Sequence, residues 1–358
     1  MNIFKTLLFF CLSTLIISCS PAVQKMGDFE LLPLPQQFEI TGVSNLKPKD
    51  LNWYHAESGE QLPFLKGALE ELEAQDNKAE AQIVFSLQEA LDVEPEGYKL
   101  NISDNQITII GKDEQGVFYG FKTLEQLVID AEEQQVNLPI CSITDQPELG
   151  YRAIHWDVKH HMEKKVYYYD LIDKLASYKV NAVIVEIEDK LKYKRQPKVG
   201  SSDAWSIEEW KELSDYAAKQ HIRISPLVQG LGHASFILKH DEYKVLRDDP
   251  KSDWAFNPLD PKTYEVQFDL YLDAMEAFPH GKYLHVGGDE VHTTGRNSGK
   301  STLELQLGWL GQVCNFAAKH DRTPIFWDDM PLKQAKVYRP MFQPKMKKQT
   351  VDLSLIHI

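Results

Sequence analysis

The chain has 358 residues, with 39 Lys and Arg against 53 Asp and Glu, and a net charge of −14 at pH 7. No cluster of basic residues suggests a groove for phosphates, so the composition argues against a nucleic-acid partner. The length is sufficient for two domains. Outside the N-terminal leader, Cys141 and Cys314 lack CxxC spacing, which argues against zinc. Two buried free thiols are expected, and a disulfide in an oxidising compartment is the alternative.

The N-terminal residues have the pattern of a targeting segment. Lys5 supplies positive charge, and residues 7–17 form an apolar stretch too short for a permanent membrane helix. The segment ends in Ile16-Ile17-Ser18-Cys19, which resembles a bacterial lipobox, where cleavage leaves a lipidated cysteine. We therefore expect a signal peptide over 1–19, a tether over 20–29, and a lipid anchor on Cys19 in a bacterial cell envelope, on its periplasmic or outer-membrane face. An ordinary secretory leader is the alternative.

Residues 30–146 predict a small α/β domain, in which short strand-like runs alternate with amphipathic stretches. The strands are predicted over 83–86, 98–102 and 106–110. Residues 116–129 have the apolar spacing of a helix. The run Asp145-Gln-Pro-Glu-Leu-Gly150 then supplies turn residues at a domain boundary.

From Tyr151 onward, apolar strands alternate with amphipathic helices, which is typical of a parallel sheet with helical crossovers. The predicted strands are 153–158, 182–188, 222–229, 283–287 and 324–327. The predicted helices between them are 166–178, 207–220, 263–278 and 303–320.

Polar residues stand at the end of each of these strands, which favours a (β/α)8 barrel of the TIM type over a doubly wound sheet. They are Asp157 and Lys159; Glu186, Glu188 and Asp189; Gln229 and His233; Asp289 and Glu290; and Trp327, Asp328 and Asp329. Only about five β/α units can be counted in the predicted barrel domain, 147–358, and eight are needed. We therefore expect an incomplete catalytic barrel in a chain truncated at its C-terminal side.

The segment Tyr283-Leu-His-Val-Gly-Gly-Asp-Glu-Val291 is the most informative part of the chain. A buried strand is followed by two glycines, which allow a sharp turn and close approach of a ligand. Two adjacent carboxylates, Asp289 and Glu290, come directly after the turn. A carboxylate pair at the end of a buried strand suits acid/base chemistry on a sugar or a phosphate ester.

Several motifs resemble glycoside hydrolase family 20, the β-N-acetylhexosaminidases. Leu284-His-Val-Gly-Gly-Asp-Glu290 is similar to the family signature, and the likeness extends over most of the chain in the family's order. Leu31-Leu-Pro-Leu-Pro-Gln-Gln37 and residues 116–127 resemble the start and end of its N-terminal domain. Glu186-Ile-Glu-Asp-Lys190 and residues 226–233 resemble the hexosaminidase D-like branch.

The resemblance implies hydrolysis of terminal non-reducing N-acetylhexosamine residues by a substrate-assisted, retaining mechanism without a cofactor or metal. In such a mechanism the sugar's own acetamido oxygen attacks the anomeric carbon, an exception to the two-carboxylate scheme. Glu290 would be the general acid, and Asp289 would orient the acetamido group. The substrate-binding residues implied are His233 with Glu188 or Asp189 as its carboxylate partner, Asp157 for sugar hydroxyls, and Trp327 for the sugar face.

The chain also departs from the family pattern. Many members carry Asp-x-x-Arg-His after the first barrel strand, whereas this chain has Asp157-Val-Lys-His-His161. Lys159 or His160 must then replace the arginine, or its role is lost. The Tyr, Trp and carboxylate that the family's last strands contribute are absent from these 358 residues.

Other interpretations of the motif stay open. Gly287-Gly-Asp-Glu-Val291 is similar to a diguanylate cyclase signature, although Val291 stands where that signature has Phe. A metal hydrolase would need ligand spacing that His160, His161, His233, His285 and His292 do not show, and a mid-strand His285 is a core residue by default. A catalytically inactive lipoprotein that binds amino sugars is the non-enzyme alternative. In the simplest alternative, Asp289 and Glu290 cap the next helix.

Overall fold

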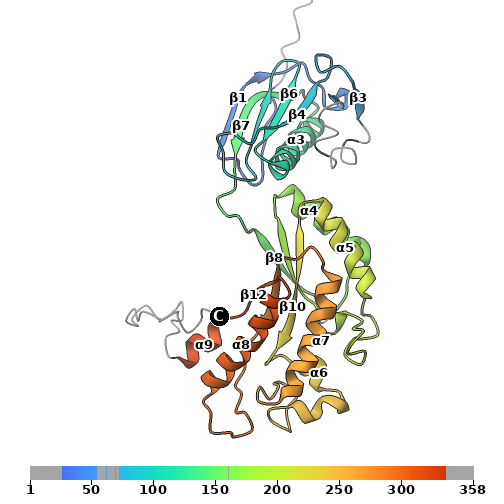
Figure 1. The fold of residues 1–358 in the computed structure, drawn as a ribbon. Coiled ribbons are helices and arrows are strands. Elements are labelled where there is room, and N and C mark those ends of the chain that lie inside the picture. Colours follow the sequence, from blue (N-terminus) through green and yellow to red (C-terminus); the bar gives the residue numbers. More distant parts are fainter. Residues whose placement is uncertain (1–25, 55–61, 63–68, 70–71, 160, 336–358) are drawn as a thin grey trace, which may run out of the picture.

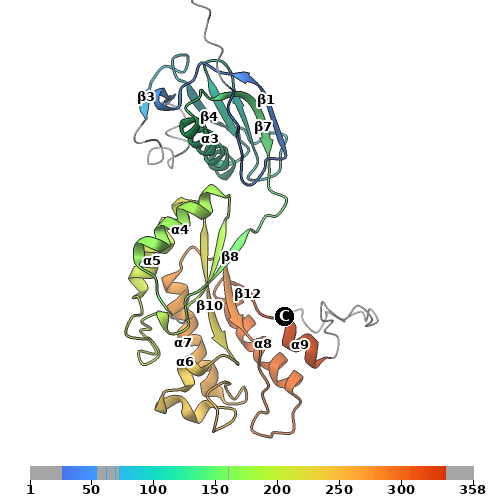
Figure 2. The same ribbon diagram turned by 180° about the vertical axis from the view of Figure 1, so that it is seen from behind.

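The computed structural model describes residues 26–54, 62, 69, 72–159 and 161–335, and these form two domains that stack end to end (Figures 1 and 2). The predicted leader with Cys19 and the segment after 335 lie outside the described residues. None of the helices in the described part is long and apolar enough to cross a membrane. Cys141 and Cys314 are both buried free thiols, as predicted.

The N-terminal domain is a seven-stranded mixed sheet with the order β1-β7-β5-β6-β4-β2-β3, covered on one face by α3, Glu114–Gln134 (Figure 1). The helix begins after Asp113, whose side chain accepts a hydrogen bond from the backbone of Gly116. The strands are β1 Gln37–Val43, β2 Asn52–Tyr54, β3 Glu73–Gln75, β4 Ile83–Leu87, β5 Tyr98–Ile102, β6 Ile107–Gly111 and β7 Pro139–Asp145. The predicted strands correspond to β4, β5 and β6. The others were not predicted, and β2 and β3 have only three residues each.

The second domain contains a five-stranded parallel sheet with the order β12-β11-β10-β9-β8. Its strands are β8 Ala153–Asp157, β9 Ala182–Glu186, β10 Arg223–Gly230, β11 Tyr283–Gly287 and β12 Thr323–Ile325. Its helices are α4 Lys165–Ser177, α5 Ile207–Lys219, α6 Ser235–Leu238, α7 Pro261–Ala277, α8 Thr302–Lys319 and α9 Asp329–Gln334. Short 3₁₀ helices lie at Pro48–Asp50 (η1), Glu188–Lys190 (η2) and Asp241–Leu246 (η3).

The predicted alternation of strands and helices is confirmed, with boundaries that differ by a few residues. One boundary is a correction: β9 ends at Glu186, and the predicted strand residue Glu188 lies in η2. The arrangement agrees with part of a TIM-type barrel. Over the described residues the sheet stays open, with β8 at one edge and β12 at the other.

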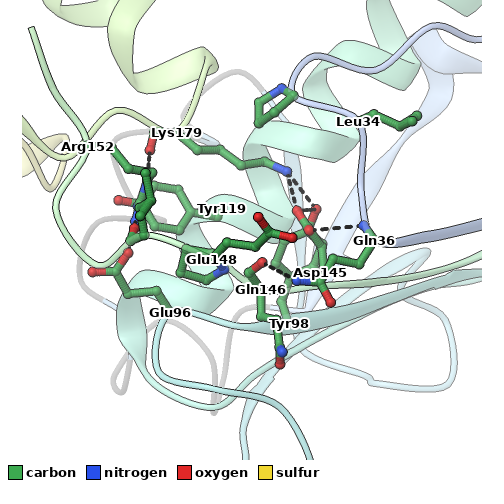
Figure 3. A pocket seen from close by; sticks show the side chains of 13 residues that line it. Leu34, Gln36, Glu96, Tyr98, Tyr119, Asp145, Gln146, Glu148, Arg152 and Lys179 are labelled. Atoms are coloured by element: carbon green, nitrogen blue, oxygen red, sulfur yellow. Dashed lines mark hydrogen bonds and ion pairs between the residues drawn. The ribbon is translucent and has the colours of Figure 1, made fainter. Parts of the chain in front are cut away.

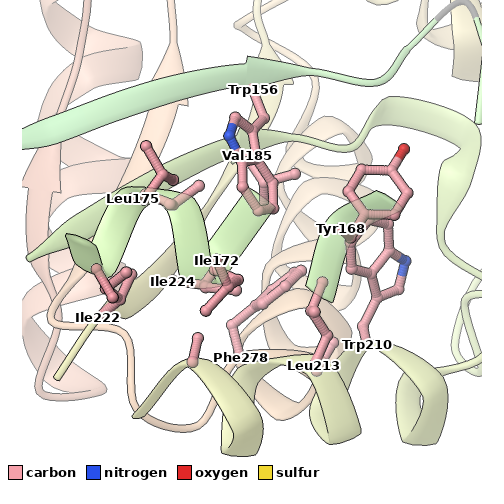
Figure 4. Close-up of a cluster of buried hydrophobic side chains, with 14 of the residues drawn as sticks. Trp156, Tyr168, Ile172, Leu175, Val185, Trp210, Leu213, Ile222, Ile224 and Phe278 are labelled. Carbon is pink, nitrogen blue, oxygen red and sulfur yellow. The ribbon is translucent and has the colours of Figure 1, made fainter. Parts of the chain in front are cut away.

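An apolar core packs between the parallel sheet and its helices (Figure 4). Trp156 and Val185 point from neighbouring strands toward α4 and α5, while the residues that alternate with them face away from these helices. Other labelled members of the cluster are Tyr168, Ile172, Leu175, Trp210, Leu213, Ile222, Ile224 and Phe278. The opposite face of the sheet is therefore available for polar residues such as Glu186.

Capping side chains determine where two of the crossover helices begin. Ser206 and Glu209 form a capping box at α5, and Ser301 and Glu304 form one at α8. In each, the serine accepts a hydrogen bond from the third helical residue, and the glutamate accepts one from the serine backbone. These boxes end the preceding loops at defined residues, and one of those loops carries Asp289 and Glu290.

The N-terminal domain contacts the second domain where the parallel strands begin. Lys179, just before β9, places Nζ 2.7 Å from Oδ2 of Asp145 and 2.9 Å from Oη of Tyr98. Arg152, just before β8, contacts Oε2 of Glu96 at 2.6 Å. These pairs line a cavity of about 290 Å³ between the domains (Figure 3). The opposite, C-terminal ends of the strands are left uncovered by this domain.

The Lys179–Asp145 pair should contribute strongly to stability because both groups are buried. Burial lowers the pKa of Lys179, and the nearby Asp145 charge opposes that effect. Asp145→Asn leaves the buried ammonium without its carboxylate, and we expect a loss of about 3–5 kcal/mol, measured by urea unfolding. The control is Asp241→Asn, which breaks an exposed pair with Lys244 and should leave stability unchanged. Equal effects of the two substitutions would contradict the assignment.

Candidate active site

The turn after β11 needs both of its glycines. Gly287 and Gly288 have φ values of 73° and 100°, a region that residues with a side chain rarely adopt. A Cβ on Gly287 would also lie 2.0 Å from Oε1 of Gln229. The tight turn brings Asp289 and Glu290 to the C-terminal edge of the parallel sheet. The strand thus ends at Gly287, as the sequence predicted.

Asp289, Glu290 and His233 come together at this edge. Nε2 of His233 lies 3.3 Å from Oδ2 of Asp289 and 3.5 Å from Oε2 of Glu290. The Asp289 side chain is largely buried, whereas 71% of the Glu290 side chain is exposed. His233 therefore stands between two carboxylates, one enclosed by protein and one open to solvent.

The electrostatics of this group favour a charged pair. The polar contact with Asp289 raises the pKa of His233 above its ordinary value, and burial opposes this only in part. Burial by itself would raise the pKa of Asp289, but the contact with His233 and its charge outweigh burial and lower it. Asp289 is thus held as a carboxylate, and His233 is biased toward the imidazolium form.

A second polar cluster surrounds the buried carboxylate of Glu186 at the end of β9. Its Oε1 accepts hydrogen bonds from Lys159 at 3.2 Å and from Gln229 at 3.0 Å, and its Oε2 lies 3.2 Å from Nε2 of His155. Burial opposes ionisation, yet these partners together lower the pKa of Glu186 to about 2. Asp157 joins the cluster through Lys159, whose Nζ lies 2.7 Å away.

Lys159 therefore lies just after the first strand of the parallel sheet and forms ion pairs with both Asp157 and Glu186. Burial tends to lower its pKa, but the two carboxylates outweigh that effect and raise it to about 12. The lysine is consequently a permanent cation at this edge. His160, the alternative replacement considered for the family arginine, lies outside the described residues.

Glu188 and Asp189 do not make the predicted contact with His233 in the described part of the chain. Glu188 is half-buried in η2, and burial together with the Glu186 charge raises its pKa to about 7. It acts on His233 only as a nearby charge. Asp189 pairs instead with Lys190 and Lys239, each at 3.4 Å. Asp289 is the carboxylate that meets the histidine.

Trp327 lies beside the end of β11. Its backbone N–H donates to the carbonyl of Gly287 at 3.0 Å, and its ring centroid is 4.7 Å from that of His285. The indole is partly exposed, so one part of it remains available to a ligand. His285 itself is buried, accepts a hydrogen bond from the Gly287 backbone, and has its pKa lowered to about 4 by burial and by His155. It is a neutral core histidine.

Two residues of the site were missed by the sequence interpretation. His155 alternates with Asp157 on β8, and this spacing of two could have indicated that both face the same side. Trp254 lies in the loop between η3 and α7, where no periodic pattern identifies it. Its Nε1 donates to the backbone carbonyl of Glu290 at 2.9 Å. No group of three His, Cys, Asp or Glu side chains among the described residues is placed to hold a metal ion.

The whole arrangement, a small α/β domain before a parallel β/α domain with adjacent carboxylates at the strand ends, is that of a glycoside hydrolase. Two family models match: "Glycosyl hydrolase family 20, domain 2" over residues 24–146 and "Glycosyl hydrolase family 20, catalytic domain" over residues 149–351. The chain belongs to glycosyl hydrolase family 20.

Individual relatives are similar at moderate identity. Hexosaminidase D of Bos taurus is 28% identical over 197 residues, which cover 50% of this chain and 55% of that protein. A β-hexosaminidase of Porphyromonas gingivalis is 28% identical over 301 residues, covering 69% of this chain and 37% of that one. The chain thus spans about half or less of these relatives. The crystal structure of β-N-acetylhexosaminidase from Bacteroides fragilis shares the fold, with a TM-score of 0.71 at 22% identity over 84% of this chain and 66% of that chain.

Glu186→Gln should destabilise the protein, because Lys159 and His155 lose the charge that they face. We expect a loss of about 3–5 kcal/mol near neutral pH. The folded-state pKa of about 2 lies below the ordinary glutamate value. The contribution is therefore present above about pH 4.3 and is lost as the pH falls toward 2.

Unfolding of wild type and variant, measured from pH 7 down to pH 3, should show a gap that narrows with acid. Glu265→Gln, on the exposed surface of α7, is the matched control and should show no gap. A difference between wild type and Glu186→Gln that stays constant with pH would contradict the role given to this carboxylate.

Proposed function

We propose that this chain hydrolyses terminal, non-reducing N-acetylhexosamine residues by substrate-assisted, retaining catalysis. The carrying observation is the contact of His233 with both Asp289 and Glu290 at the strand ends. Membership in family 20 and the names of the relatives, hexosaminidases and β-hexosaminidases, support the same substrate class. No step of this reaction requires a cofactor.

Asp289 is suited to hold the acetamido group of the sugar. Its depressed pKa keeps it ionised, so it accepts a hydrogen bond from the amide N–H and stabilises the positive charge that develops on that nitrogen. This polarisation makes the acetamido oxygen a better nucleophile toward the anomeric carbon. The bond from that carbon to the leaving oxygen then breaks, and a cyclic oxazolinium ion forms.

Glu290 is suited to handle the proton. Its carboxyl group transfers a proton to the leaving oxygen as the glycosidic bond breaks, and the resulting carboxylate then accepts a proton from the water that opens the oxazolinium ring. His233, biased toward its cationic form, lies next to both carboxylates and compensates their charge during this exchange. The high exposure of Glu290 agrees with a group that must reach a leaving sugar and solvent water.

The two carboxylates should respond differently to neutral isosteric substitution. Glu290→Gln removes the proton donor, so kcat toward an aryl N-acetyl-β-glucosaminide should fall by about 10²–10⁴-fold, while sugar binding survives. Asp289→Asn removes the group that orients the acetamide, so activity should fall together with the affinity for an oxazoline-mimicking inhibitor.

Steady-state kinetics and calorimetric titration with that inhibitor separate these outcomes, and Glu265→Gln serves as the surface control. Unchanged turnover in Glu290→Gln would refute its assignment as the acid. Binding of N-acetylglucosamine without hydrolysis by the wild type would favour an inactive amino-sugar-binding protein instead.

We further propose that Cys19 carries a lipid that anchors the protein to a bacterial cell envelope. The support is the leader pattern, an apolar stretch that ends in Ile16-Ile17-Ser18-Cys19. Cys19→Ser should shift the protein from the detergent phase to the aqueous phase in a phase-partition experiment on cells that express it. Cys11→Ser, which alters a cysteine inside the apolar stretch, is the matched control and should stay in the detergent phase. Equal partitioning of wild type and Cys19→Ser would exclude the anchor.

A further inference from the structure

The side chain of Trp254 is exposed to solvent, yet a hydrogen bond and a ring contact hold it in one position. The side chain is 39% exposed, although it belongs to a residue type that usually buries most of its surface. Its Nε1–H donates to the carbonyl of Glu290 at 2.9 Å, and its ring centroid lies 4.4 Å from that of His233. The indole is thus held by the backbone carbonyl of Glu290 and by the ring of His233, while the rest of the side chain is exposed to solvent.

The loop that carries Trp254 is held firmly to the end of β10. The backbone of Ala234 donates to the carbonyl of Trp254 at 3.0 Å, and the backbone of Phe256 donates to Leu231 at 2.8 Å. The hydroxyl of Ser235 contacts the carboxylate of Asp253 at 3.0 Å. The indole is therefore presented by a preorganised loop, so a ligand that stacks on it would not have to order the loop first.

The position of Trp254 relative to the two carboxylates defines which part of a substrate it can meet. Asp289 is assigned to the acetamido group of the sugar that is cleaved, whereas Glu290 protonates the oxygen that joins this sugar to the leaving group. The indole N–H of Trp254 donates to the main-chain carbonyl of Glu290 and makes no hydrogen bond with Asp289. Trp327, the other exposed indole at this edge, lies with His285 and His155 instead. The two indoles therefore have different neighbours within the site.

We propose that Trp254 is a specificity-determining residue that stacks on the first sugar of the leaving group. This inference rests on the proposed hydrolysis and extends it to β-linked oligosaccharides as the preferred substrate class. The apolar C–H face of a pyranose ring fits an indole face, and contact with the exposed part of Trp254 removes apolar surface from water. A leaving group without a ring gains nothing from this contact.

The test compares two substrates with unactivated alkyl leaving groups, a β-linked N-acetylglucosamine disaccharide and methyl N-acetyl-β-glucosaminide. Trp254→Leu should lower kcat/KM for the disaccharide about five- to tenfold more than for the methyl glycoside. Trp254→Phe retains a ring but lacks the indole N–H. It should weaken the attachment of Glu290 and reduce both substrates alike, so the preference for the disaccharide persists.

Equal losses on both substrates in Trp254→Leu would overturn the proposal and leave Trp254 as a brace for Glu290 alone. A binding experiment makes the test independent of turnover. In a Glu290→Gln background, Trp254→Leu should weaken disaccharide binding and leave N-acetylglucosamine binding unchanged in calorimetry. Failure of the wild type to cleave any of these glycosides would refute the proposed hydrolysis, whereas an unchanged disaccharide affinity would refute the stacking role of Trp254.

Discussion

The candidate active site depends on the ion pairs and hydrogen bonds of the buried Glu186 carboxylate. A glutamate that is almost fully buried is costly unless its charge is met by partners. Those partners come from both neighbouring strands, since Lys159 and His155 belong to the β8 side and Gln229 to β10. The ends of three strands are therefore joined by ion pairs and hydrogen bonds as well as by packing.

The two ends of the parallel sheet make different contacts. Where the strands begin, the Lys179–Asp145 and Arg152–Glu96 pairs attach the N-terminal domain. Where the strands end, charged side chains such as Lys159, Glu186 and Asp289 gather and are not covered by that domain (Figure 1). This division agrees with the general behaviour of β/α barrels, in which one face provides stability and the other chemistry.

The sequence predicted regular elements well where one pattern dominated. The strand 283–287 was predicted with its observed bounds because an apolar run meets two glycines that cannot extend it. The prediction that extended β9 to Glu188 was wrong, since the apolar Ile187 continues the pattern although the backbone already turns. The contact of Trp254 with Glu290 joins residues 36 positions apart and depends on the conformation of two loops. Periodicity carries no information about such a contact, so it emerged only from the structure.

Three residues with a strained backbone lie in or beside the candidate active site. Glu188, His233 and Glu290 have φ values of 35°, 50° and 43°, a left-handed region that is unfavourable for residues with a Cβ. Each such residue costs about 1–3 kcal/mol and persists only where the surroundings hold it. For Glu290, that support includes the indole N–H of Trp254 on its own carbonyl, and for His233 it includes the ring of the same tryptophan. The residue proposed to recognise the leaving sugar thus also supports the strained backbone of Glu290, the residue proposed as the acid.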